Sequence, residues 1–322
     1  LVDGSEAAAV QFVLAPDSVD KAAGLVAERL KLQLTRFPVA IANPFMPPQT
    51  MSLSGRLNGS MDVSGRLSSP LLNGSIASDS VGVYVNMLGS TLRFGDKPIV
   101  VDNNVLRFDD FNITAYNDNP LSVNGTVDAS KFSDIMLDLT AAARNMQLTG
   151  GKKSKGDITG NLFIDLDAGV KGPLSRMNVD ATLNVLPTTD VTYMMTMDSD
   201  MLNSQGGADD VVRFVNFADS TLVAKADSIH SSMTMRINAK AIISQGTQIA
   251  VDLAGSGKVE CNPSGTLNYF QNYMGDMRLS GTLYTGTGYA RYKVPLLGNK
   301  AFDFDRDSHI LSLIHISEPT RH

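Results

Sequence analysis

Residues 53–67 read LSGRLNGSMDVSGRL and alternate strictly between two kinds of residue. Apolar residues and glycines take every odd position, and polar residues take every even one. Because successive side chains of a strand point to opposite faces of a sheet, this register predicts one apolar and one polar face. The stretch is longer than a typical strand, and Asn58-Gly59 is a favoured hairpin dipeptide. It therefore predicts two strands joined by a tight turn.

The same period-two pattern recurs along the chain, in Ile158–Leu166, Met177–Val185, Met233–Ala241, Ile249–Val259 and Met277–Leu283. Turn-forming residues stand between or beside such segments, at Pro70, Asn73-Gly74, Asn124-Gly125, Gly172-Pro173 and Pro263. Glycines in phase with the apolar residues favour bending and close backbone approach. The pattern predicts an all-β fold: an elongated antiparallel β-groove, in which a curled, solenoid-like sheet folds as a taco around an apolar interior, with one or two short helices.

Three segments have helix-like patterns. Asp17 or Ser18 can cap a helix over Val19–Arg29, and Asp209-Asp210 precede a short amphipathic pattern that ends at Phe217. A third such pattern covers Leu267–Tyr273. Prolines predict an extended, non-helical stretch between the first helix and residue 53, at Pro38, Pro44, Pro47 and Pro48.

Composition narrows the classes of function. The net charge is −6 with the charges interspersed, so no basic stripe indicates nucleic acid as a partner. Cys261 is the only cysteine, which rules out an intrachain disulfide. The chain is poor in aromatic residues, lacks Trp and has 15 Met. Such a surface suits contact with flexible apolar partners, although plain core filling gives the same composition.

Both ends of the sequence are unusual. The chain begins with Leu1 rather than Met, so we expect that an upstream membrane anchor is missing. Residues 311–321 read LSLIHISEPTR, which resembles the translation of a sequencing adapter. We expect the natural sequence to end near Ile310, and we exclude His315 and His322 as candidate site residues.

Three stretches together resemble one family. They are Leu53–Ile76 (LSGRLNGSMDVSGRLSSPLLNGSI), TTDVTYMM at 188–195 with DDVVRFVNF at 209–217, and Met277–Ile310 (MRLSGTLYTGTGYARYKVPLLGNKAFDFDRDSHI). In this order they are similar to the C-terminal region of the translocation and assembly module subunit TamB, of the AsmA-like superfamily. The resemblance spans most of residues 52–310 and contains no catalytic motif.

The resemblance implies a bacterial envelope protein. Such a protein is anchored in the inner membrane by an N-terminal helix and crosses the periplasm as a β-groove. At its far end it meets an outer-membrane barrel of the Omp85 family that is similar to TamA. The family is linked to phospholipid transport and to outer-membrane biogenesis. We expect 1–51 to comprise the end of an upstream repeat and a short helix, and 52–310 to form the groove (sub-repeats about 52–150, 151–230 and 231–310). We expect 311–322 to be an artefact derived from the adapter.

The apolar positions of the strands are the candidate groove residues. A groove could hold phospholipid acyl chains, since each buried CH₂ contributes roughly 0.8 kcal/mol. The candidates are Leu53, Leu57, Met61, Val63, Leu67, Leu162, Ile164, Leu166, Val179, Leu183, Met233, Met235, Ile237, Val251, Leu253, Leu279 and Leu283. Three alternatives remain: the core of a filled sandwich, a scaffold that assists outer-membrane β-barrel or autotransporter proteins by strand addition, and a surface β-solenoid adhesin.

Other motifs give little support for chemistry. Asp303–Ser308 resembles the start of a calcium loop but lacks its glycine and its final glutamate. Gly255-x-Gly257 and Gly286-x-Gly288 lack the third glycine of a nucleotide-binding turn. His230 and His309 have no metal-ligand partner at a suitable spacing. We expect no cofactor, no metal and no enzymatic activity.

Overall fold

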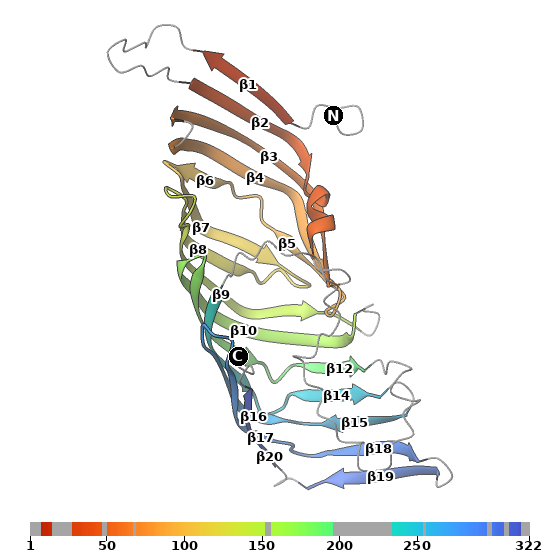
Figure 1. Cartoon of the computed structure of the whole chain (residues 1–322). Coiled ribbons are helices and arrows are strands. Elements are labelled where there is room, and N and C mark those ends of the chain that lie inside the picture. The colour runs from red at the N-terminus through yellow and green to blue at the C-terminus, as the bar shows by residue number, and fades with distance from the viewer. Residues whose placement is uncertain are drawn as a thin grey trace.

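The computed structural model describes residues 8–14, 28–46, 50–66, 69–151, 156–195, 234–253, 256–294, 298–305 and 309–316. In these ranges the chain forms one sheet of 20 hydrogen-bonded strands and a single 3-10 helix, η1 (Val39–Phe45). Figure 1 shows the strands following one another like rungs along an elongated, curled body. The predicted all-β class is confirmed.

The strands of the first half of the sheet are β1 (Ala8–Leu14), β2 (Glu28–Pro38), β3 (Met51–Arg66), β4 (Ser69–Val85), β5 (Ser90–Phe94), β6 (Ile99–Asp102), β7 (Val105–Thr114), β8 (Leu121–Asp128), β9 (Met136–Thr149) and β10 (Ile158–Pro173). Each pairs with the next in antiparallel fashion. The exception is the short pair β5 and β6, which share one rung between β4 and β7.

The second half contains β11 (Arg176–Val185), β12 (Asp190–Met194), β13 (Thr234–Ile243), β14 (Gln248–Asp252), β15 (Gly257–Cys261), β16 (Ser264–Gln271), β17 (Met277–Tyr284), β18 (Gly288–Val294), β19 (Gly298–Phe304) and β20 (His309–Ile316). At β10 the sheet divides, because residues 158–161 pair with β12 whereas residues 164–171 pair with β11. One wall continues as β11, β13, β16, β17 and β20, and the other as β12, β14, β15, β18 and β19.

Each rung of the second half is a pair of strands that the chain joins at a corner, as β11 continues into β12 and β13 into β14. Most pairings are antiparallel, as predicted, but two are parallel, β11 with β13 and β12 with β14, so the sheet is mixed. The physical reason is connectivity: both rungs run in the same direction along the chain, so equivalent strands meet in parallel.

Buried threonines secure the corners. The Thr189 hydroxyl accepts a hydrogen bond from the Phe163 N–H and donates to the Phe163 carbonyl, both at 3.1 Å. The Thr247 hydroxyl donates to the Ser244 carbonyl at 2.7 Å. Such bonds satisfy backbone groups that the change of direction removes from the strand ladder. The corners therefore depend on a few buried polar side chains.

The predicted hairpin at Asn58-Gly59 is wrong, because β3 runs unbroken through both residues. A Cβ on Gly59 would lie 2.6 Å from the Ser75 carbonyl oxygen of β4, so glycine serves close strand approach here. The Asn58 side chain instead accepts a hydrogen bond from the Arg36 N–H at 2.8 Å. Four other predicted turns also lie within strands, namely Pro70 and Asn73-Gly74 in β4, Asn124-Gly125 in β8 and Gly172-Pro173 at the end of β10.

The helix predictions fare differently. Residues 267–271 belong to β16, so the predicted helix over Leu267–Tyr273 is wrong; alternating contacts on both sides of a strand outweigh a weak helical pattern. The proline-rich stretch, predicted to be extended, contains η1 with Pro44 inside it. The helix predicted over 209–217 lies outside the described residues, as does that over 19–29 except for its last two residues, which begin β2.

The C-terminal strand includes residues assigned above to an adapter-like tail. Residues 309–316 form β20, which pairs with β17 over its whole length. An alternating apolar sequence of this kind is sufficient for strand pairing whatever its origin. The proposed division of the chain at residue 310 remains a prediction.

Candidate functional site

The strand register brings apolar residues of distant segments into continuous rows. One row crosses the first wall through Leu121, Ala143, Leu166, Leu183, Ala241, Leu267 and Gly281. A second row follows the other wall through Ile158, Tyr193, Val251, Val259, Ala290 and Phe302. Because β10 belongs to both walls, these rows belong to one apolar face.

The apolar face is only partly covered. Leu166, Leu183 and Ile237 are half-buried, as are most other apolar residues of the face. In a filled sandwich the central side chains of both sheets would interdigitate and lose nearly all contact with solvent. The exposure pattern is therefore that of a trough with an accessible apolar lining.

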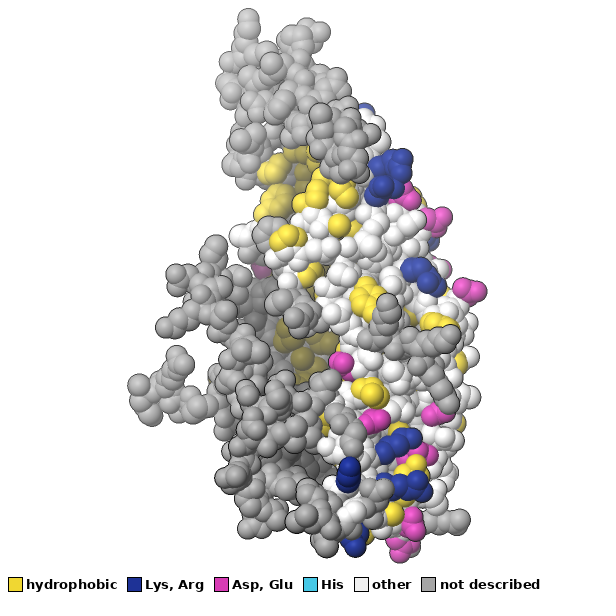
Figure 2. Space-filling view, turned by 90° about the vertical axis from the view of Figure 1, so that its right-hand side faces the viewer, with side chains coloured by type: hydrophobic (Ala, Val, Ile, Leu, Met, Phe, Trp, Pro, Cys, Tyr) yellow, Lys and Arg dark blue, Asp and Glu magenta, His cyan; other side chains and the backbone are white. Residues whose placement is uncertain are grey.

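The opposite face of the sheet is polar. The residues next to the first row, on the outer side of the same strands, are Ser122, Asp167, Thr182, Lys240 and Asn268, and they line a shallow hollow of about 630 Å³. Ion pairs on this side are exposed, such as Arg144 with Asp167 at 2.7 Å. Figure 2 shows hydrophobic side chains gathered near the N-terminal strands and charged side chains mainly along the right-hand side of the view.

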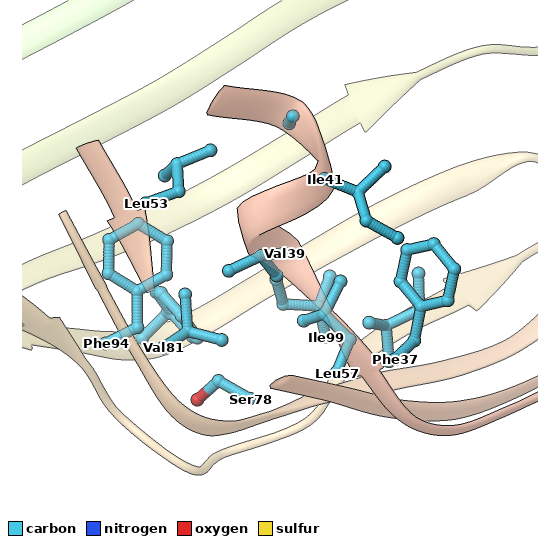
Figure 3. Close-up of a pocket in the computed structure, with 12 residues that line it drawn as sticks. Phe37, Val39, Ile41, Leu53, Leu57, Ser78, Val81, Phe94 and Ile99 are labelled. Carbon is cyan, nitrogen blue, oxygen red and sulfur yellow. The ribbon is translucent and has the colours of Figure 1, made fainter. Parts of the chain in front are cut away.

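At the N-terminal part of the trough, η1 lies over the apolar face and roofs a cavity of about 530 Å³. Eleven of its twelve lining residues are apolar: Phe37, Val39, Ile41, Ala42, Leu53, Leu57, Ile76, Val81, Phe94, Ile99 and Phe111. In Figure 3, Val39 points from η1 toward Leu57 and Ile99, while Leu53, Val81 and Phe94 lie at one end.

The single polar lining residue has its partner already. The Ser78 hydroxyl donates a hydrogen bond to the Gly95 carbonyl oxygen. On the floor, Phe111 packs edge-on against Phe94, with ring centroids 5.8 Å apart. A cavity lined in this way offers dispersion contacts and dry surface but no free polar group for recognition.

Next to the cavity the trough is filled. Met146, which is 2% exposed, forms a buried cluster with Ala115, Ala143 and Ile164. Leu92 of β5 packs against this cluster, and Phe94, two residues further along β5, lines the cavity. The apolar interior thus contains an open section, the cavity, directly beside a filled section, the Met146 cluster.

Electrostatic features lie on the walls rather than in the cavity. The Lys258 ammonium, 2.9 Å from Glu260, and the Tyr289 hydroxyl both hydrogen-bond Glu260 and lower the pKa of its carboxyl group. Burial raises the pKa of the Cys261 thiol, which stands on the apolar face beside Ile249. Within the described ranges, no group of three or more His, Cys, Asp or Glu could hold a metal ion.

The structure separates the predicted groove residues into sets. Leu53 and Leu57 line the cavity, Ile164 belongs to the filled cluster, and Leu162, Leu166 and Leu183 pack against it. The other predicted groove residues lie on strands of the two walls and of the N-terminal part of the sheet. They are Met61 and Val63 on β3, Val179 on β11, Met235 and Ile237 on β13, Val251 on β14, and Leu279 and Leu283 on β17, with Leu253 directly after β14. Leu67 and Met233 lie outside the described residues.

Sequence reasoning missed the residues that roof and floor the cavity. Val39, Ile41 and Ala42 belong to η1, in a stretch that the prolines predicted to be extended. On β4, a bulge at Ser80 moves the apolar residues from even to odd positions, which hides Val81 from a strict period-two count. The apolar run Val81, Val83 and Val85 was the available indication of this change.

These features define a class of protein: a curled β-sheet protein whose walls enclose an accessible apolar face. The model of the TamB C-terminal domain family matches residues 109–312, more than half of the chain, and the chain belongs to that family. No curated protein and no solved structure matches the chain. In the described part of the chain, none of the helices has the length and apolarity needed to cross a membrane.

Proposed function

We propose that this chain is a non-enzymatic lipid conduit of the bacterial envelope, whose trough shields phospholipid acyl chains from water. The observation that carries the proposal is the continuous apolar face, which crosses both walls and is partly exposed over most of its length outside the filled Met146 cluster. Membership of the TamB C-terminal domain family supports it. Moving hydrocarbon past water requires continuous apolar lining rather than a reaction centre.

In this proposal the chain works in the periplasm as part of a longer protein anchored in the inner membrane. Its partner at the outer membrane is an Omp85-family barrel similar to TamA. The function served is outer-membrane biogenesis, through phospholipid supply.

The test is native mass spectrometry of the full chain purified gently from a bacterial periplasm, with lipid extraction in parallel. Leu183→Asp places a charge on the apolar face, and Thr182→Asp places the same charge on the outer face of the same strand. Val179→Thr, which is nearly isosteric, keeps the test valid if Leu183→Asp fails to fold. We expect co-purifying phospholipid in the wild type and Thr182→Asp, and reduced occupancy in the other two. Lipid-free wild type, or equal occupancy in all four, would contradict the proposal.

A second candidate function is a scaffold for outer-membrane β-barrel proteins, and it rests on the edges of the sheet. Within the described residues, β19 pairs only with β18 and β20 pairs only with β17. A strand edge can template the addition of another strand. The scaffold predicts binding of an unfolded barrel segment that survives Leu183→Asp, whereas the conduit predicts loss of lipid in that variant.

A further inference from the structure

The cavity beneath η1 differs from the rest of the trough because it has a roof. The chain leaves β2 at Pro38, crosses the apolar face as η1, and returns to begin β3 at Met51. Ile41 lines the cavity and is nevertheless 53% exposed. The roof is therefore one residue layer thick, with the cavity on one side and solvent on the other.

Two hydrogen bonds hold η1 against β3. The Asn43 side chain accepts a hydrogen bond from the Leu53 N–H at 2.6 Å and donates one to the Leu53 carbonyl at 3.0 Å. Register pairing of β2 with β3 ends at Pro38 and Arg56, so this edge of β3 has lost its strand partner by Leu53. The amide of Asn43 thus takes the place of a neighbouring strand and fixes η1 over the trough.

We infer that η1 and the trough beneath it form a bounded binding station for one unbranched hydrocarbon chain, whose polar headgroup stays outside. The inference rests on the proposed lipid function and deepens it. The cavity volume of about 530 Å³ falls within the range of about 300–1,000 Å³ typical of ligand pockets. The only polar side chain of the lining, Ser78, is already hydrogen-bonded, so no lining side chain is available to bind a polar headgroup.

The station is also limited along the trough. Its floor is braced by the edge-on contact between Phe94 and Phe111, and the Met146 cluster occupies the adjoining section. A hydrocarbon chain that moves from the station toward this section must therefore repack the Met146 cluster. Phe111 is the only lining residue within the range that the family model matches, so the station lies almost wholly in the preceding part of the chain.

Two matched substitutions on η1 test the station. Ala42 lines the cavity, whereas Ala40 lies on the same helix, is exposed and does not line it. Ala42→Trp fills the space from the roof, and Ala40→Trp adds the same bulk outside. The probe is a palmitic acid with a diazirine at mid-chain, irradiated with the full chain and mapped by peptide mass spectrometry.

For the wild type and Ala40→Trp, we expect crosslinks to peptides that contain Leu53, Leu57 and Val81. In Ala42→Trp these crosslinks should fall at least five-fold, while crosslinks to the strands β11 and β13 persist. Equal labelling of the cavity peptides in all three proteins, or none in the wild type, overturns the station. Absence of labelling on β11 and β13 in the wild type would instead count against the proposed lipid function. Failure of the station and failure of the lipid function are therefore distinguishable.

Discussion

The side-chain oxygen of Asn124 accepts a hydrogen bond from the backbone N–H of Asp110, 2.7 Å away on the neighbouring strand. Asp110 has a φ of +51° and belongs to a bulge between β7 and β8. A bulge removes a backbone N–H from the strand ladder and sharpens the local twist. Asn124 restores a partner for the displaced N–H, so the bulge bends the sheet without leaving that donor unpaired.

The arrangement recurs along the sheet. At the bulge between β2 and β3, Arg36 has a φ of +52° and donates its N–H to Asn58. At the bulge between β9 and β10, Asn145 has a φ of +49° and donates to Asp165. Repeated capped bulges explain how a long sheet curls into a trough rather than staying flat.

Asn58→Ala should destabilise the protein by about 1 kcal/mol, because the Arg36 N–H loses its protein acceptor. Asn58→Asp retains an oxygen acceptor at the same place and should keep most of the stability. The measurement is the free energy of unfolding in urea for the three proteins. Equal losses in both variants would show that the cap contributes nothing beyond side-chain packing.

Gly125→Ala should be far more costly than Gly169→Ala. Gly125 has a φ of +125°, and a Cβ there would lie 2.0 Å from the Asp138 carbonyl oxygen. Backbone strain and overpacking each cost about 1–3 kcal/mol, so we expect a loss of at least about 2 kcal/mol. At Gly169 the nearest atom is 3.9 Å away, and we expect little change. Thermal unfolding measures both, and similar melting temperatures would contradict this account of strand approach.

Thr189→Val should destabilise the corner between β11 and β12. The substitution conserves shape but leaves the part-buried Phe163 N–H without its hydroxyl acceptor, whereas the Phe163 carbonyl keeps its hydrogen bond from the Leu186 N–H. An unsatisfied buried polar group costs about 1–3 kcal/mol. Thr189→Ser retains the hydroxyl and serves as the control. If the valine and serine variants unfold at the same denaturant concentration, the hydroxyl does not secure the corner.

Cys261 provides a chemical probe of the apolar face. Burial raises the pKa of its thiol, with a smaller contribution from the Glu260 charge. The thiolate fraction at neutral pH is therefore below that of an exposed cysteine, and alkylation by iodoacetamide should be slower. The rate should increase as the pH rises, with a midpoint above that of the urea-unfolded chain. A rate and midpoint equal to those of the unfolded chain would show that the thiol is not shielded.

Sequence periodicity predicted the strands well because each apolar face repeats every second residue in β10, β11, β13 and β17. It misread Asn58-Gly59, because the same dipeptide suits a hairpin and a strand that faces a bulge. The contact with Arg36 on the partner strand decides between the two structures, and Arg36 is 22 residues away in the sequence, so local sequence does not reveal this contact. The roof was hidden for a similar reason: η1 is held by the contact of Asn43 with Leu53, not by helix propensity.

The central claim is that hydrocarbon contacts the apolar face of the trough. The chain contains no Trp, so a single introduced Trp reports on one position. Ile237→Trp places it on the apolar face, and Asn238→Trp places it on the opposite face of the same strand. Each protein is loaded from vesicles of phospholipid brominated at mid-chain and separated from them before fluorescence is measured. The account predicts strong quenching in Ile237→Trp and little in Asn238→Trp. Equal quenching at both positions, or none at either, would contradict it.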